Sequence, residues 1–139
     1  GFHGHNNLGL ANANALEAMN LNADIIDCSL QATGRSTGNT CTEQFVAILK
    51  RMNKGADYDL LRLLATGQKY IRPHAASPVS DVDIISGYAG FHSSYLKSLI
   101  MVSEEVGVDP VELIIALCKR TQISAPEDLI REVARGLKK

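Results

Sequence analysis

The first twelve residues constrain the fold of this chain most, because they have the pattern of a short strand that leads directly into a helix. Two histidines, His3 and His5, stand two residues apart on the expected strand. A strand repeats every two residues, so both side chains should project from one face, roughly 6–7 Å apart at their Cα atoms. An apolar stripe at helical spacing follows at Leu8, Ala11, Ala15 and Met19. The pattern predicts two imidazoles at the carboxyl end of a strand, where catalytic groups collect in barrel-type α/β folds.

The composition narrows the class of protein. The chain has 139 residues, of which 45% are hydrophobic, and a formal net charge of −1. The absence of a basic cluster argues against a nucleic-acid partner, and no apolar run approaches the roughly 20 residues that span a membrane. Three widely spaced cysteines, an odd number, fit a reduced protein, so we expect a cytoplasmic location. Because the chain opens directly on the histidine strand, we also expect it to be a piece of a longer polypeptide.

A second strand is expected over residues 23–29, whose apolar centre is typical of a buried parallel strand. Strand, helix and strand in this order predict a right-handed parallel crossover. The Gly-rich residues 32–39 should form a loop at the carboxyl end of the second strand. That loop would lie on the same side of the sheet as the two histidines.

Helices are expected after this loop. Thr40 and Glu43 have the spacing of a capping box, which predicts a helix start. Asp57 is expected to cap a third helix that ends before Pro73. The inward-facing residues of that helix are expected to be Leu60, Leu61, Leu64 and Ile71. Residues 1–72 therefore form the predicted α/β part, and residues 73–87 are predicted to be a linker.

Residues 88–139 are predicted to form a small helical domain. Apolar residues from Phe91 to Val106 follow helical spacing, and Gly107 should end that helix. Asp109 with Pro110 predicts a capped helix start, and Ser124 with Glu127 predicts a further capping box.

Three side chains are candidate metal ligands. His3 and His5 supply imidazole nitrogens, and Asn39 at the end of the Gly-rich loop could supply an amide oxygen. Nitrogen and oxygen ligands suit Mn²⁺, Mg²⁺, Zn²⁺ or Co²⁺. The alternatives are a solvated histidine pair and an asparagine that only stabilises its own turn. Asp27, on the second strand, either orients a metal-bound imidazole or bonds loop amides.

Further candidates could contact a substrate. Gly34 permits close backbone approach to a ligand and Ser36 adds a hydroxyl donor, although the loop lacks the spacing of a phosphate-binding P-loop. Arg35 either meets a substrate carboxylate or is an exposed loop residue. His92, after a Gly-rich turn, is either a general acid or an ordinary helix-start residue. Cys118 has the spacing of a core residue.

The sequence as a whole resembles a known family. The stretches "GFHGHNNLGLANANALEA", "IIDCSL", "GNT" and "EQFVAIL" resemble the metal-dependent aldolases and lyases built on a (β/α)8 barrel. Within that superfamily, "SGYAGFHSSYLKS" and "PEDLI" make the chain most similar to the 4-hydroxy-2-oxovalerate aldolases. The resemblance implies the C-terminal part of a TIM barrel, over residues 1–72, followed by the small helical domain.

The resemblance also implies roles for residues. His3 and His5 would bind a divalent metal, usually Mn²⁺, and Asn39 would be a weaker third candidate. In the family a tyrosine implicated in proton transfer stands at the position of His92, so this chain departs from the pattern there. The loop also departs from the family's Gly-Ala-rich pattern. The family's aspartate ligand and its catalytic arginine and histidine come from the first barrel strand, and nothing here matches them.

The implied activity is metal-assisted retro-aldol cleavage of a 4-hydroxy-2-oxo acid to pyruvate and an aldehyde. A complete barrel needs about 250 residues, so activity is expected only in a full-length parent. The helical domain would dock against an acylating acetaldehyde dehydrogenase that receives the aldehyde. Two alternatives remain. One is a lyase or acyl-CoA condensing enzyme of the same superfamily, whose lyases carry a reactive cysteine within the loop. The other is a module that only binds a partner.

Overall fold

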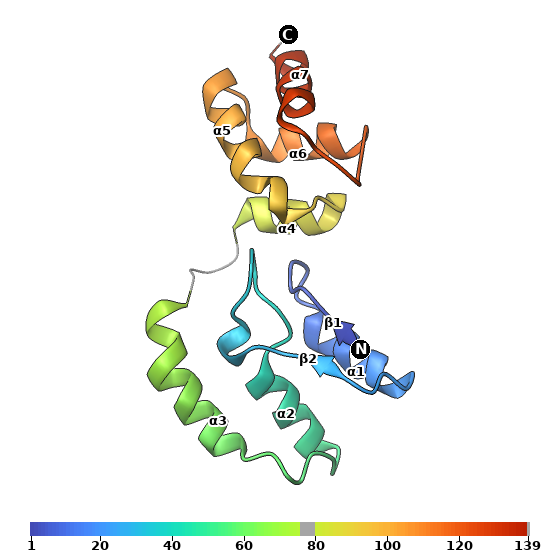
Figure 1. Ribbon diagram of the computed structural model, residues 1–139, viewed down its shortest axis with the longest axis vertical. Helices are drawn as coiled ribbons and strands as arrows, with labels where there is room; N and C mark the ends of the chain where they lie inside the picture. The colour runs from blue at the N-terminus through green and yellow to red at the C-terminus, as the bar shows by residue number, and fades with distance from the viewer. Residues whose placement is uncertain (76–79, 139) are drawn as a thin grey trace. The chain divides into compact units, whose positions relative to one another are not determined.

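The computed structural model (Figure 1) describes residues 1–75 and 80–138, and the chain divides into two compact units, Gly1–Val79 and Ser80–Lys139. Among the described residues, strands occur only in the first unit, and the second unit consists of helices and their connections. The mixed α/β class predicted from the sequence is confirmed. No helix within the described ranges is both long and apolar enough to cross a membrane.

The first unit begins with the expected crossover. Strand β1 (Phe2–His3) pairs in parallel with β2 (Ile26–Asp27), and helix α1 (Ala11–Asn20) connects them. The register places Phe2 opposite Ile26 and His3 opposite Asp27. Regular pairing covers only two of the residues predicted as strand over 23–29. The short sheet matters for the site because it puts His3 and Asp27 side by side.

Helical segments complete the first unit. The elements after β2 are η1 (Leu30–Ala32), α2 (Thr42–Arg51), α3 (Leu60–Thr66), the π-helical turn η2 (Gly67–Ile71) and η3 (Arg72–His74). Helices α1 and α2 pack together around the buried side chains of Ala15, Phe45 and Leu49, and Phe2 and Ile26 of the strands pack against these side chains.

The capping box predicted at Thr40 and Glu43 is wrong. Helix α2 begins at Thr42 after Cys41, and no side chain caps its first turn. The Thr40 hydroxyl is buried without a hydrogen-bond partner among the described residues. The Glu43 carboxylate instead accepts hydrogen bonds from Gln31, 12 positions earlier in the chain. A tertiary partner therefore outcompetes the local cap.

The third helix also differs from its prediction. Asp59 caps α3, accepting a hydrogen bond from the Arg62 amide at 3.0 Å, whereas Asp57 was expected to do so. The side chains of Leu61 and Leu64, expected to face inward, are 77% and 45% exposed. The α-helix ends at Thr66, and the chain continues through η2 and η3 as far as His74.

The second unit is a bundle around a continuous apolar core. The elements of this unit are α4 (Asp81–Ala89), η4 (Ser93–Tyr95), α5 (Leu96–Val106), α6 (Pro110–Cys118) and α7 (Glu127–Leu137). Helix α5 packs against α7, and α4 packs against α6. The fully buried side chains of the core are Leu99, Val102, Leu113, Ile114, Leu117 and Ile130.

The linker predicted over residues 73–87 is wrong over part of its length. Residues 76–79 lie outside the described residues, but η3 reaches into the predicted linker from one side and α4 from the other. Ser80 and Asp83 form a reciprocal capping box at the start of α4, and Gly90 ends the helix in the left-handed conformation. The first helix of the second unit therefore starts before residue 88.

The other helix ends agree with the sequence in part. Gly107 closes α5 with φ +75°, and Asp109 caps α6 by accepting a hydrogen bond from the Val111 amide at 2.7 Å. The helix expected from Phe91 starts as the short turn η4 and becomes α-helical at Leu96. The capping box predicted at Ser124 is wrong, because α7 begins after Pro126 without a side-chain cap.

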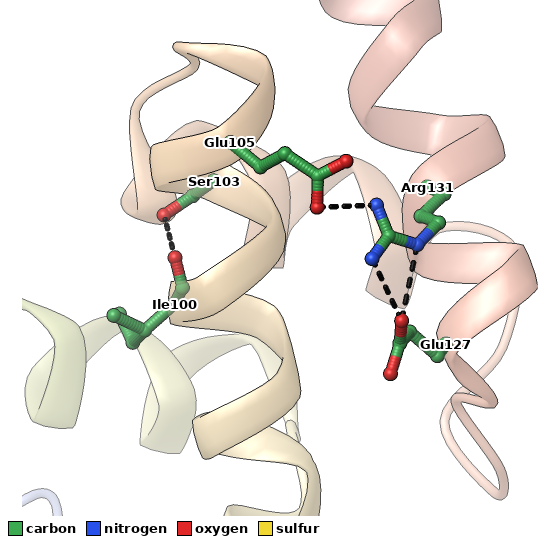
Figure 2. A network of polar contacts seen from close by, with 5 residues as sticks. All are labelled: Ile100, Ser103, Glu105, Glu127 and Arg131. Carbon is green, nitrogen blue, oxygen red and sulfur yellow. Dashed lines mark hydrogen bonds and ion pairs between the residues drawn. The ribbon is translucent and has the colours of Figure 1, made fainter.

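A charged network joins two helices of the second unit (Figure 2). Arg131 of α7 donates to Glu105 of α5 at 2.6 Å and to Glu127 of its own helix at 2.8 Å. The buried Ser103 hydroxyl nearby donates to the Ile100 carbonyl of its own helix at 2.8 Å. Arg131 therefore ties α5 to α7 at the surface, above the apolar core.

Candidate metal centre

The two histidines of the first motif lie next to each other. The ring centroids of His3 and His5 are 5.0 Å apart and their planes are nearly perpendicular. His3 belongs to β1, and His5 follows the strand in an antiparallel bridge with Asn39. Both residues are exposed. The structure thus gathers two imidazoles at one accessible end of the sheet.

Asp27 orients one of these imidazoles. Its Oδ2 atom lies 2.7 Å from Nδ1 of His3, across the paired strands. A carboxylate only accepts hydrogen bonds, so Nδ1 of His3 is the donor, and in the neutral imidazole Nε2 is then the nitrogen with the lone pair. Carboxylate–histidine pairs of this kind fix the ring orientation and tautomer of metal-binding histidines. Of the two interpretations of Asp27, the geometry therefore favours the orienting role.

Asn39 brings a third candidate atom to the site. Its backbone pairs with His5, and its Nδ2 atom donates to the Thr33 carbonyl at 3.2 Å. Its Oδ1 atom is buried and has no hydrogen-bond partner among the described residues. Buried amide oxygens without a partner are rare, because each costs the free energy of its lost hydration. A bound cation would satisfy this oxygen.

The Gly-rich loop is packed closely against Asn39. A Cβ atom on Gly34 would lie 2.8 Å from the amide carbon and oxygen of Asn39, so a side chain there would displace the amide. Gly38 has φ +82°, and a Cβ atom there would lie 1.7 Å from the Ala32 carbonyl oxygen. Both glycines therefore permit the loop to close on itself.

The loop is also tied to the histidine segment. The Asn6 amide donates to the Gly38 carbonyl at 2.9 Å, and the Thr40 amide donates to the Gly4 carbonyl at 3.0 Å. Asn7 donates from Nδ2 to the Ser36 hydroxyl at 3.0 Å. Ser36 thus contacts Asn7, two residues beyond His5, and its contact with a substrate remains a prediction.

Sequence reasoning missed several asparagines that hold these segments together. The Asn6 Oδ1 atom accepts a hydrogen bond from the Ala11 backbone amide at the start of α1. Asn12 Oδ1 accepts from the Cys41 amide at 2.9 Å, and Asn12 Nδ2 donates to Gln44 at 2.7 Å. The density of asparagines in residues 6–14 was the available signal, because asparagine side chains commonly bond backbone groups.

The described residues supply only part of a metal site. They contain no group of three or more histidine, cysteine, aspartate or glutamate side chains placed to hold an ion. His3, His5 and Asn39 offer two neutral nitrogens and one neutral oxygen, a donor set that suits the middle of the first transition row. The partnerless oxygen of Asn39 fits that set.

Two cysteines near the loop are poor nucleophiles. Burial raises the pKa of the Cys28 thiol, and the neighbouring Asp27 raises it further. Burial is also the main cause that raises the pKa of Cys41. The thiolate is the reactive form of cysteine, so neither side chain has the environment of a catalytic thiol.

His92 lies in the second unit and is described there by itself. Its Nδ1 atom accepts a hydrogen bond from the Ser94 amide at 3.2 Å, which makes it the cap of η4. Its ring meets Tyr95 edge to face at 6.1 Å between centroids. The side chain borders a small crevice lined by Phe91, Cys118 and residues 121–125. The helix-start role of His92 is thus visible, and a role in catalysis remains a prediction.

Comparison with known proteins places both parts of the chain. Residues 1–69 match the family model described as HMGL-like, and residues 78–139 match the DmpG-like communication domain. A 4-hydroxy-2-oxovalerate aldolase of Geobacillus stearothermophilus is 37% identical over 136 residues, covering 96% of this chain and 40% of that protein. The aldolase of the same name from Roseiflexus castenholzii is 39% identical, covering 99% of this chain and 41% of that protein.

The chain spans about 40% of the length of these curated relatives. The aldolase from Streptomyces tendae gives the same result, with 37% identity over 99% of this chain. The chain therefore matches the HMGL-like family model in its first half and the DmpG-like communication domain in its second, and it is similar to 4-hydroxy-2-oxovalerate aldolases over nearly its whole length.

Proposed function

We propose that this chain is part of a divalent-metal-dependent aldolase that cleaves 4-hydroxy-2-oxo acids, such as 4-hydroxy-2-oxovalerate, to pyruvate and an aldehyde. The observation that carries the proposal is the contact between the His3 and His5 rings, together with the backbone bridge that joins His5 to Asn39, whose side-chain oxygen has no hydrogen-bond partner among the described residues. The names and family matches of the relatives support the same reaction class. The activity belongs to the full-length protein, because this chain spans about 40% of its relatives.

The first unit supplies the last βα units of a (β/α)8 barrel in this proposal. A two-stranded sheet is marginal by itself, and parallel sheets are normally covered on both faces. Large apolar side chains of this unit are exposed, and further barrel elements would cover such surface. Those most exposed are Leu21, Ile25 and Leu61.

The metal would be held by His3, His5 and Asn39, with Mn²⁺ favoured and Mg²⁺, Co²⁺ or Zn²⁺ as the alternatives. When bound, such an ion supplies Lewis-acid polarisation of the 2-oxo acid. Asp27 keeps the His3 imidazole oriented with a free lone pair. The backbone at Gly34 and the hydroxyl of Ser36 would contact the substrate, because both lie on the loop that carries Asn39. His92 would handle the substrate proton, in place of the family tyrosine.

The second unit would dock the partner enzyme. The match to the DmpG-like communication domain supports an acylating acetaldehyde dehydrogenase, the partner expected from the family resemblance. A cytoplasmic location is proposed with it, because all three cysteines in the described residues are free. The raised thiol pKa values of Cys28 and Cys41 disfavour the related lyase, whose loop cysteine must be reactive.

Pyruvate release tests the proposal. The full-length protein with Mn²⁺ should produce pyruvate from 4-hydroxy-2-oxovalerate, as measured with a lactate dehydrogenase couple. His3→Ala or His5→Ala should abolish that rate, whereas His74→Ala, an exposed histidine of η3, should leave it unchanged. Full activity in either motif variant would refute the metal assignment. If the full-length protein binds the dehydrogenase but releases no pyruvate, the alternative of a module that only binds a partner is supported instead of an aldolase.

A further inference from the structure

The carboxylate of Glu43 is buried, with 4% of the residue exposed, and most of its partners come from a single residue. The backbone nitrogen of Gln31 lies 3.1 Å from Oε1 and 2.9 Å from Oε2 of Glu43. The side-chain nitrogen of Gln31, Nε2, donates to Oε1 at 2.8 Å. The Cys41 thiol donates to Oε2 at 3.3 Å. Burial alone would raise the pKa of Glu43, but these donors outweigh it and the pKa is lowered. The carboxylate is therefore held ionised against Gln31.

Gln31 needs such a partner because of its backbone conformation. Gln31 and Ala32 have φ values of +55° and +53°, in the left-handed region that residues other than glycine avoid. Two such residues in succession persist only when the surrounding structure holds them. The bonds from Gln31 to Glu43 supply that constraint from helix α2.

The left-handed turn leads directly to Asn39. The Ala32 carbonyl accepts from the Asn39 amide at 3.1 Å, and the Thr33 carbonyl accepts from Asn39 Nδ2. These two contacts fix both the backbone and the side-chain amide of Asn39. With Nδ2 engaged by Thr33, Oδ1 is the atom of the side-chain amide that has no hydrogen-bond partner among the described residues, and it is the atom that the proposed function assigns to the ion. A shift of the turn would therefore reorient that oxygen.

We infer that Glu43 is a positioning residue for the metal centre, which acts by holding the Gln31–Ala32 turn that aims the Asn39 oxygen. The inference rests on the proposed function, because it assigns Asn39 a cation. It assigns Glu43 no contact with that cation or with substrate. Glu43 then matters to metal affinity through the loop, and its replacement should weaken binding without removing a ligand.

Mn²⁺ titration of the full-length protein, followed by electron paramagnetic resonance, tests this inference. Glu43→Gln keeps the shape of the side chain but replaces one acceptor oxygen with a donor, so it cannot accept all the bonds from Gln31. We expect about tenfold weaker Mn²⁺ affinity or more, the usual effect of losing an outer-shell partner. Glu17→Gln, at an exposed glutamate of α1, is the matched control and should bind like the unmodified protein.

A double-substitution cycle separates positioning from general damage. If Glu43 acts through Asn39, adding Glu43→Gln to Asn39→Ala should weaken Mn²⁺ binding little further. Additive losses would overturn the inference. Gln31→Gly should restore much of the affinity of Glu43→Gln, because glycine adopts positive φ without strain. Absence of rescue would also overturn it.

Two controls keep the outcomes distinct. Urea unfolding without metal shows whether Glu43→Gln folds. If it does not, Gln31→Ala is the second variant, because it removes the Nε2 donor to Glu43 and otherwise only the long contact of Oε1 with Arg72 at 3.5 Å. That variant should weaken Mn²⁺ binding, and unchanged affinity would overturn the inference. If His3→Ala weakens Mn²⁺ binding and folded Glu43→Gln does not, only the role of Glu43 is wrong. If the unmodified protein binds another of the proposed ions in place of Mn²⁺, the same variants are compared with that ion by titration calorimetry. If it binds none of Mn²⁺, Mg²⁺, Co²⁺ and Zn²⁺, the proposed function fails and this inference fails with it.

Discussion

The Nδ1 atom of His3 lies 2.7 Å from Oδ2 of Asp27, across two parallel strands in register. The pair is about half exposed, with the His3 side chain 47% and the Asp27 side chain 62% accessible. Exposed ion pairs contribute little to folding stability, so this contact serves the orientation of the imidazole more than the stability of the fold.

Asp27→Asn should therefore weaken metal binding more than it weakens the fold. The asparagine side chain of this variant would offer His3 only a neutral acceptor or a donor. The His3 imidazole would therefore lose the charge-assisted hydrogen bond that sets its tautomer. We expect Mn²⁺ affinity of the full-length protein to fall about tenfold, with a melting temperature close to that of the unmodified protein. Asp24→Asn, at an exposed aspartate three residues earlier in the chain, is the control. Equal affinities for both variants would contradict the orienting role.

Gly9 and Gly38, two of the glycines in the left-handed region, form a matched pair for testing the loop. Gly9 has φ +74° with open space around the position of a Cβ atom, so Gly9→Ala should cost only the conformational penalty of about 1–2 kcal/mol. In Gly38→Ala the added carbon would also collide with the Ala32 carbonyl, which should cost at least about 2 kcal/mol more. Urea unfolding of both variants measures the difference, and equal losses would mean that the loop relaxes freely.

Arg131 should stabilise the second unit in a pH-dependent way. Its hydrogen bond lowers the pKa of Glu105 below the ordinary value. A depressed folded-state pKa contributes stability above the unfolded pKa, which is near 4.3 for glutamate, and the contribution is lost as pH falls through the folded value. The melting temperature of Arg131→Gln should thus lie below that of the unmodified protein at pH 7, and the gap should close under acid. Lys97→Gln, at an exposed lysine of α5, is the control, and a gap for Arg131→Gln that persists under acid would contradict this.

Removing residues 80–139 should separate the two proposed roles. The full-length protein ending at residue 79 should lose co-purification with the acylating acetaldehyde dehydrogenase, because the communication domain is gone. His3→Ala should retain that co-purification while losing activity. Loss of partner binding in His3→Ala, with retention in the truncated protein, would place the docking surface in the first unit.

His92→Tyr should change how activity depends on pH. Imidazoles ordinarily titrate near pH 6.5 and phenols near pH 10, so a proton-handling histidine gives the pH–rate profile a limb that tyrosine cannot. The variant should move that limb. His74→Tyr, at a histidine of the first unit, should leave the profile unchanged. Superimposable profiles for His92→Tyr and the unmodified protein would leave His92 as the cap of η4 alone.

The sequence by itself determined the features that depend on neighbouring residues. Asp109 before Pro110 caps α6 and Gly107 closes α5, as predicted, because capping groups bond amides only a few positions away. The strand–helix–strand order at the start of the chain was also readable, since the period of apolar residues changes with the local structure. Ser80 with Asp83 carried an equally local signal for α4, which the proline-rich composition around it obscured.

Only the tertiary structure decided which polar groups meet across the chain. Glu43 had the spacing of a local helix cap, but its carboxylate is buried and accepts hydrogen bonds from Gln31 instead. A buried charge is costly unless hydrogen-bond donors surround it, and Gln31 supplies such donors. The bridge between His5 and Asn39 joins residues 34 positions apart, and no pattern along the chain encodes it. The histidine motif was thus visible in the sequence, whereas the partnerless oxygen of Asn39 beside it follows from loop closure, which depends on contacts distant in sequence.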